Sequence, residues 1–88
     1  MSRRRVVVAA LAPTTDDDPA LQVSRTHLQR GDEVVHLGSG LDPDAVAGSV
    51  VAEDAVHVVL VGADPAALER TRTALAALDA SDVTVDAG

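Results

Sequence analysis

The chain lacks cysteine, lysine, asparagine, isoleucine and every aromatic residue. Without cysteine it can form neither disulfides nor thiolate metal sites, which fits the reducing cytoplasm, and we expect the protein to reside there. Without aromatic rings it has no platforms on which single-stranded nucleic acid could stack. Its net charge of −7 repels phosphate backbones and anionic lipids. These features predict a cytoplasmic protein that binds neither nucleic acid nor a membrane.

The hydrophobic residues, 47% of the chain, are almost all alanine, valine and leucine. The length of 88 residues predicts a single domain, 1–88. A domain of this size buries only roughly 60 to 65% of the surface that its unfolded chain exposes. We therefore expect a modest core that is built without large rings.

Short apolar runs alternate with segments of helical periodicity along the chain. The apolar runs predict strands at 6–11, 33–37, 56–61 and 83–85, and the periodic segments predict helices at 20–30, from 43 to about 54, and from 65 to a turn at 79–82. This alternation is typical of βαβ units around a buried parallel sheet. With right-handed crossovers the simplest strand order is 2-1-3-4. The predicted fold is a flavodoxin-like or Rossmann-like α/β fold with three α-β-α layers, in which the chain ends before a fifth strand.

Several helix ends carry local signals. Asp42 and Asp64 each precede a proline, a pair typical of an N-cap followed by the first helical residue. Gly31 stands where a helix C′ glycine belongs. The side chains expected to face the sheet are Ala20, Val23, His27 and Leu28 in the first helix and Leu68, Thr71, Leu75 and Leu78 in the third.

In a sheet of this kind, the loops at the carboxyl ends of the strands border the ligand crevice, which opens above strands one and three. Here these loops are 12–19, 37–41, 62–64 and 86–88. The first is the most distinctive, because Thr14, Thr15, Asp16 and Asp17 give it hydroxyls and carboxylates but no histidine.

Four segments resemble the cobalamin (B12)-binding modules of adenosylcobalamin mutases and corrinoid methyltransferases. The family's pattern reads "aGfeVv", "lG", "tPeeiv" and "advVgvSsl". The corresponding segments here are Arg30-Gly31-Asp32-Glu33-Val34-Val35, Leu37-Gly38, Asp42-Pro43-Asp44-Ala45-Val46 and Asp54-Ala55-Val56-His57-Val58-Val59. The resemblance spans nearly the whole chain. It implies a B12-binding-like domain, related to the small subunit or domain of mutases such as methylmalonyl-CoA mutase and glutamate mutase.

The residues that touch the cofactor in that family differ here. With the Gly31 turns aligned, Thr14, Asp16 and Pro19 replace the aspartate, histidine and glycine of the family's D-x-H-x-x-G motif. The histidine of that motif is the lower cobalt ligand, and an aspartate offers cobalt a harder oxygen that suits it poorly. The resemblance therefore implies a degenerate module with no metal ligand and no catalytic residue. It either binds cobalamin weakly, without histidine ligation and with the cofactor's own base attached, or has lost binding altogether. The positions implied to contact the cofactor are Thr14, Thr15, Asp16, Asp17, Gly38, Gly62, Ala63, Asp64 and Gly88.

The candidate residues also have structural interpretations. Asp64 is explained as a helix cap, and Asp16 to Asp18 as a cap or a solvated loop. His27 and His57 are expected to be packing residues, with His57 at the end of the sheet opposite the crevice. His36 is the histidine near the crevice end, on a strand displaced from the first loop. No two histidines have a spacing typical of a metal site.

Two functions of other classes stay open. The exposed edge of strand four suggests a structural or regulatory subunit without a ligand, completed there by a companion chain or by self-association. Acidic residues after strand one, together with Asp64, imitate the Mg²⁺ and phosphoacceptor pocket of a phospho-receiver switch, although the chain has no lysine. No P-loop, G-x-G-x-x-G motif or Ser/His/Asp order is present. Any chemistry would therefore belong to a bound cofactor or to a companion catalytic subunit of the mutase kind.

Overall fold

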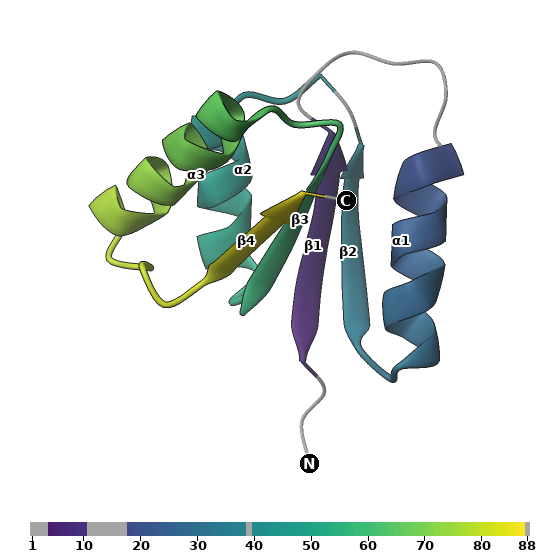
Figure 1. The fold of residues 1–88 in the computed structure, drawn as a ribbon. Coiled ribbons are helices and arrows are strands. Elements are labelled where there is room, and N and C mark those ends of the chain that lie inside the picture. The colour runs from purple at the N-terminus through teal and green to yellow at the C-terminus, as the bar shows by residue number, and fades with distance from the viewer. Residues whose placement is uncertain (1–3, 11–17, 39, 88) are drawn as a thin grey trace.

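The computed structural model describes residues 4–10, 18–38 and 40–87 (Figure 1). The strands are β1 (Arg5–Ala10), β2 (Glu33–Gly38), β3 (His57–Val61) and β4 (Thr84–Ala87), and the helices are α1 (Asp18–Gln29), α2 (Pro43–Ala52) and α3 (Pro65–Ala77). All four strands lie parallel in one sheet, in the order β2-β1-β3-β4. The predicted α/β fold and strand order are confirmed, and each element end lies within two residues of its predicted position.

The inner strands of the sheet are rich in valine, and the register places these valines side by side. Val7 of β1 pairs with Val35 of β2 and with Val58 of β3. Branched side chains suit a pleated, buried surface because they pack well against their neighbours on adjacent strands. Val6 and Val7 point to opposite faces of β1, and both are fully buried. Strand β1 is therefore covered on both faces.

Helices cover the two faces of the sheet unequally (Figure 1). Helices α2 and α3 pack on one face, where Leu60 and Leu75 belong to the larger cluster of buried side chains. Helix α1 packs on the opposite face, mainly over β1 and β2, where Val6, Val8 and Val59 form a smaller cluster. Among the described elements, no helix lies over β4 on the α1 side. The face of β4 on the α1 side is therefore left without a described helix over it.

The predicted helix-end signals are confirmed. Asp42 and Asp64 each accept a hydrogen bond through Oδ1 from the backbone N–H three residues on, at 2.7 and 2.8 Å. Gly31 has a φ of 87°, and the N–H of Asp32 donates to the carbonyl of His27 at 3.0 Å. This is the pattern with which a C′ glycine ends a helix.

Two leucines predicted to face the sheet are exposed instead. Leu28 is 56% exposed, while Ser24 is buried. Because α1 lies mainly over β1 and β2, only a narrow stripe of this helix, including Ser24 and His27, reaches the sheet. Leu78 is 47% exposed because α3 ends at Ala77 and Leu78 is already its C-cap. None of the described helices combines the length and the apolar character needed to cross a membrane.

The arginines that the structure describes at the start of β1 are paired with acidic residues. Arg5 Nη2 lies 2.8 Å from Glu33 Oε2, and its Nη1 donates to the carbonyl of Glu53 at 2.6 Å. Arg4 Nη2 lies 3.5 Å from Asp32 Oδ2. These contacts tie the start of β1 to the start of β2 and to the end of α2.

Candidate functional site

The crevice is predicted at the carboxyl ends of the strands, and described glycines mark the ends of β2 and β3 there. Gly38 ends β2 with a φ of 92°, and Gly62 follows β3 with a φ of 72°. Within the described part of the chain, a Cβ added at either position would meet no heavy atom within 4 Å. Glycine therefore suits these positions because of their left-handed backbone, and not because a neighbouring atom would exclude a side chain. Ala63, the next candidate, is half-buried against the larger core cluster.

Asp64, the last described candidate of this loop, is committed to a structural role. Its carboxylate caps α3, as its sequence signature predicts. We expect Asp64→Ala to lower the free energy of unfolding by about 1 kcal/mol, because an N–H in the first turn of α3 loses its acceptor. Asp64→Asn should stay close to wild type, since an amide oxygen caps nearly as well. Urea unfolding followed by circular dichroism checks both, and equal losses in the two variants would contradict the capping role.

Five of the predicted contact positions, Thr14, Thr15, Asp16, Asp17 and Gly88, lie outside the described residues, so their roles stay predictions. His36 is described. It lies in β2 opposite Val8 of β1, two residues before Gly38, and its side chain is exposed. It is therefore near the crevice end of the sheet, as expected.

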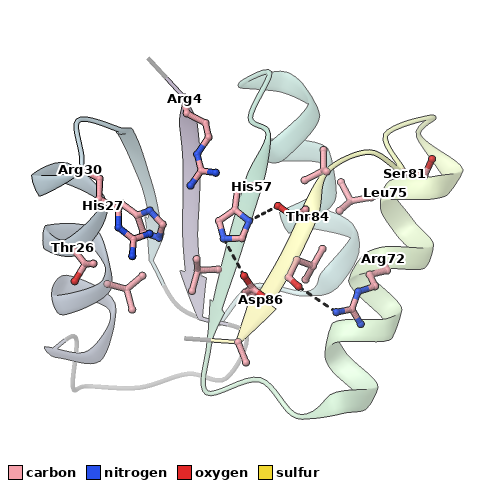
Figure 2. Close-up of a pocket in the computed structure, with 15 residues that line it drawn as sticks. Arg4, Thr26, His27, Arg30, His57, Arg72, Leu75, Ser81, Thr84 and Asp86 are labelled. Atoms are coloured by element: carbon pink, nitrogen blue, oxygen red, sulfur yellow. Dashed lines mark hydrogen bonds and ion pairs between the residues drawn. The ribbon is translucent and has the colours of Figure 1, made fainter. Parts of the chain in front are cut away.

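A second concave feature lies on the α1 side of the sheet, where β3 and β4 are open. It is a hollow of about 910 Å³ that runs between α1 and the outer strands (Figure 2). Its floor includes Val59, and it extends past Val85 at the edge of β4 to Arg72 of α3. Its polar lining includes Arg4, Thr26, His27, Arg30, His57 and Asp86. Sequence reasoning missed this hollow, because it depends on how much of the sheet α1 covers.

Two buried histidines form the amino end of the hollow. His27 is in the last turn of α1, His57 is the first residue of β3, and their ring centroids are 5.8 Å apart. They are 7% and 8% exposed, so the prediction that both are packing residues is confirmed as far as burial goes. The sequence did not indicate that they would meet, since 29 residues separate them in the chain.

Each ring of the pair also has polar partners. Nδ1 of His27 is 2.9 Å from Oδ2 of Asp32, the carboxylate that also approaches Arg4. Nδ1 of His57 hydrogen-bonds with Oγ1 of Thr84, and its Nε2 lies 3.5 Å from Oδ2 of Asp86 (Figure 2). The register places these partners, because Thr84 is paired with His57 across β3 and β4.

The environment of the pair changes the protonation of two groups. Burial lowers the pKa of His57 below its ordinary 6.5, the charges of Arg4 and His27 lower it further, and the carboxylate of Asp86 opposes the change. The hydrogen bond with His27 lowers the pKa of Asp32 below its ordinary 3.8, and the charge of Arg4 acts in the same direction. At neutral pH His57 is therefore neutral in the hollow, and Asp32, behind His27, is ionised.

A metal centre finds no support in the part of the chain that the structure describes. No three His, Asp or Glu side chains there lie close enough together to hold an ion. The phospho-receiver alternative needs the carboxylate of Asp64, which is engaged as a helix cap. Its other carboxylates, at 16 and 17, are outside the described residues.

Comparison with known proteins supports the fold assignment. No protein-family model and no curated protein matches the chain. Among solved structures, the chain is similar to a novel cobalamin-binding protein from Desulfitobacterium hafniense DCB-2, with a TM-score of 0.75 and 25% sequence identity. The match covers 98% of this chain and 44% of that protein. The chain thus shares the fold of part of a cobalamin-binding protein and spans less than half of its length.

Proposed function

We propose that this domain binds a corrinoid over the carboxyl ends of β1 and β3 and leaves the cobalt without a histidine ligand from the chain. The observation that carries the proposal is the likeness to a cobalamin-binding protein over 98% of the chain. Gly38 and Gly62 add support, because among the described residues no atom lies within 4 Å of where a Cβ would stand, so a flat ring could approach the backbone there.

The distribution of histidines supports binding without imidazole ligation. The segment between β1 and α1 contains none. His27 and His57 are buried at the amino end of the hollow, which is the end of the strands opposite the crevice. His36 projects from β2 rather than from the loop after β1. The lower position of cobalt is then left to the cofactor's own base or to water, because a carboxylate such as Asp16 suits cobalt poorly.

Gel filtration with hydroxocobalamin tests the proposal. We expect the red cofactor to co-elute with the protein and to keep a visible spectrum without imidazole ligation. Gly62→Asn should weaken binding about tenfold, equivalent to about 1.4 kcal/mol. Asparagine tolerates the left-handed backbone at this position but puts a side chain into the crevice.

A matched control is available at the other end of the sheet. Gly31 has a similar left-handed backbone, with a φ of 87° against 72° at Gly62, and it precedes β2. Gly31→Asn should therefore leave cobalamin binding unchanged. Failure of the wild-type protein to retain any cobalamin would contradict the proposal, and so would equal binding by the two asparagine variants.

A companion catalytic subunit is part of this proposal, because the described residues offer no catalytic constellation and the chemistry would belong to the cofactor and its partner. The free edge of β4 is where a companion chain or a second copy could join the sheet. Arg72 partly covers this edge, since its Nη2 donates to the carbonyl of Val85 at 3.2 Å. The same gel-filtration runs, repeated over a range of concentrations, show whether the protein self-associates.

A further inference from the structure

We propose that the hollow beside β3 and β4 binds a tetrahedral dianion, a sulfate or a phosphate ester, between Arg4, His27 and His57, and that the dianion binds together with a proton. This inference goes beyond corrinoid binding, because the three side chains lie at the amino ends of the strands and the crevice lies at their carboxyl ends. It concerns a second site on the same domain.

The charge of the hollow differs from that of the whole protein. The chain carries a net charge of −7, yet three arginines, Arg4, Arg30 and Arg72, line the hollow together with both buried histidines. Among the acidic side chains that the structure describes, only Asp86 lines it. Asp32 contacts Arg4 and His27, and Glu69 contacts Arg72, so the hollow favours an anionic ligand once its histidines are protonated.

The geometry of the two rings leaves one nitrogen of each for a ligand. Nδ1–H of His27 donates to the ionised carboxylate of Asp32, so its Nε2 faces a ligand as a lone pair and can donate only when the ring is protonated. Nδ1 of His57 is engaged with Thr84, and its Nε2 faces Asp86 at 3.5 Å, which is longer than a hydrogen bond. The two side chains are only 9% and 11% exposed, so these nitrogens are held in place.

Asp86 marks the position that an anion would take at His57. Its side chain is 72% exposed, and among the described residues its one polar side-chain contact is the long one with His57. A carboxylate held this loosely can rotate into water and be replaced by an oxygen of sulfate or phosphate at closer range. Arg4 lies on the same side of the rings, where Figure 2 shows its guanidinium pointing toward the histidines. The dianion would thus gain donors at once from Arg4, which precedes β1, and from α1 and β3.

Proton uptake follows from the partners of His57. The hydroxyl of Thr84 lies 3.4 Å from the carbonyl of Val56, and when it points there it accepts a hydrogen bond from Nδ1–H of His57. Neutral His57 then carries a lone pair on Nε2, and this nitrogen must gain a proton before it can donate to an anion. The charged groups around the pair are Arg4, Arg30, Asp32 and Asp86. The bound dianion adds negative charge to this set, which stabilises the protonated rings.

Proton NMR of the imidazole rings tests the proposal, with sulfate as the probe because it stays a dianion over the whole pH range. In sulfate, at ionic strength matched with chloride, the titration midpoints of His27 and His57 should rise. By linkage, sulfate should bind about tenfold more tightly at pH 5.5 than at pH 7.5. His36, exposed on β2, is an internal control whose midpoint should not change.

Two arginine variants complete the test. Arg4→Gln should abolish the effect of sulfate, whereas Arg25→Gln should retain it, because Arg25 is exposed on α1 and does not line the hollow. If Arg4→Gln disturbs the fold, Arg30→Gln takes its place in the test. This variant should keep the wild-type backbone spectrum and should weaken the effect of sulfate. A second titration uses adenosine monophosphate. If it shifts the same rings at a lower concentration than sulfate does, the site is one for a phosphate ester; if the two act at equal concentrations, the site is one for the free ion. Equal shifts of all three histidines, or none, would overturn the proposal, whatever the result with cobalamin.

Discussion

Leu60→Ala is expected to lower the free energy of unfolding by about 3 kcal/mol, because a fully buried leucine in β3 would leave a cavity beneath α2 and α3. A domain of 88 residues has a total stability of about 4 to 13 kcal/mol. The melting temperature should fall by roughly 12 to 24 °C, at 4 to 8 °C per kcal/mol for a domain of this size. Thermal unfolding followed by far-ultraviolet circular dichroism measures the change.

Leu78→Ala is the matched control for this prediction. Leu78 is 47% exposed at the C-cap of α3, so the same change of side chain should cost well under about 1 kcal/mol. The sequence predicted that Leu78 faces the sheet, whereas the structure exposes it. Comparing the two variants therefore also tests which of these two placements is right. If the two variants lost the same stability, the placement of the core between β3 and α3 would be wrong.

The stability of the domain is expected to fall as the pH drops below 6.5. Burial lowers the pKa of His57 in the folded state below that ordinary value, so the unfolded chain binds more protons than the folded chain in this range. The free energy of unfolding then decreases as the pH falls. Asp32 acts in a separate window, because its lowered pKa makes its contribution disappear only below its ordinary 3.8. Urea unfolding between pH 8 and pH 4.5 therefore isolates the histidine.

His57→Asn is the variant that identifies the responsible group. Asparagine does not titrate and can still hydrogen-bond with Thr84 across β3 and β4. The loss of stability between pH 6.5 and pH 4.5 should be smaller in this variant than in the wild type. His36→Asn, which changes an exposed side chain, should retain the wild-type profile. A profile that responds to His36→Asn and not to His57→Asn would place the titrating group elsewhere.

Most of the fold could be predicted from the sequence, because its determinants are local. The valine runs define the strands, and Asp42, Asp64 and Gly31 define helix ends through backbone geometry alone. Strand order followed from the handedness of the crossovers. The exposure of Leu28 was not predictable, because the width of the buried stripe on α1 depends on how much of the sheet lies beneath that helix.

The candidate sites were less accessible to sequence reasoning. The role of Asp64 as a cap is readable from the proline that follows it. The histidine pair is not, since His27 meets His57 only because α1 packs over the sheet, and Thr84 reaches His57 only through the register of β3 and β4. Such contacts join residues about thirty positions apart, and no periodicity records them. The predicted loop contacts Thr14 to Asp17 stay predictions.

Electron paramagnetic resonance of cob(II)alamin bound to uniformly nitrogen-15-labelled protein tests the central proposal most directly. A nitrogen ligand splits the cobalt signal into three lines when it is nitrogen-14, from the cofactor's own base, and into two lines when it is nitrogen-15, from a protein imidazole. In the fraction that co-elutes with the protein, we expect three lines or no nitrogen splitting. Asp16→Asn should give the same pattern, because position 16 supplies no imidazole in either protein. A two-line pattern from the wild-type protein would contradict the proposal, because a histidine of the chain would then hold the cobalt.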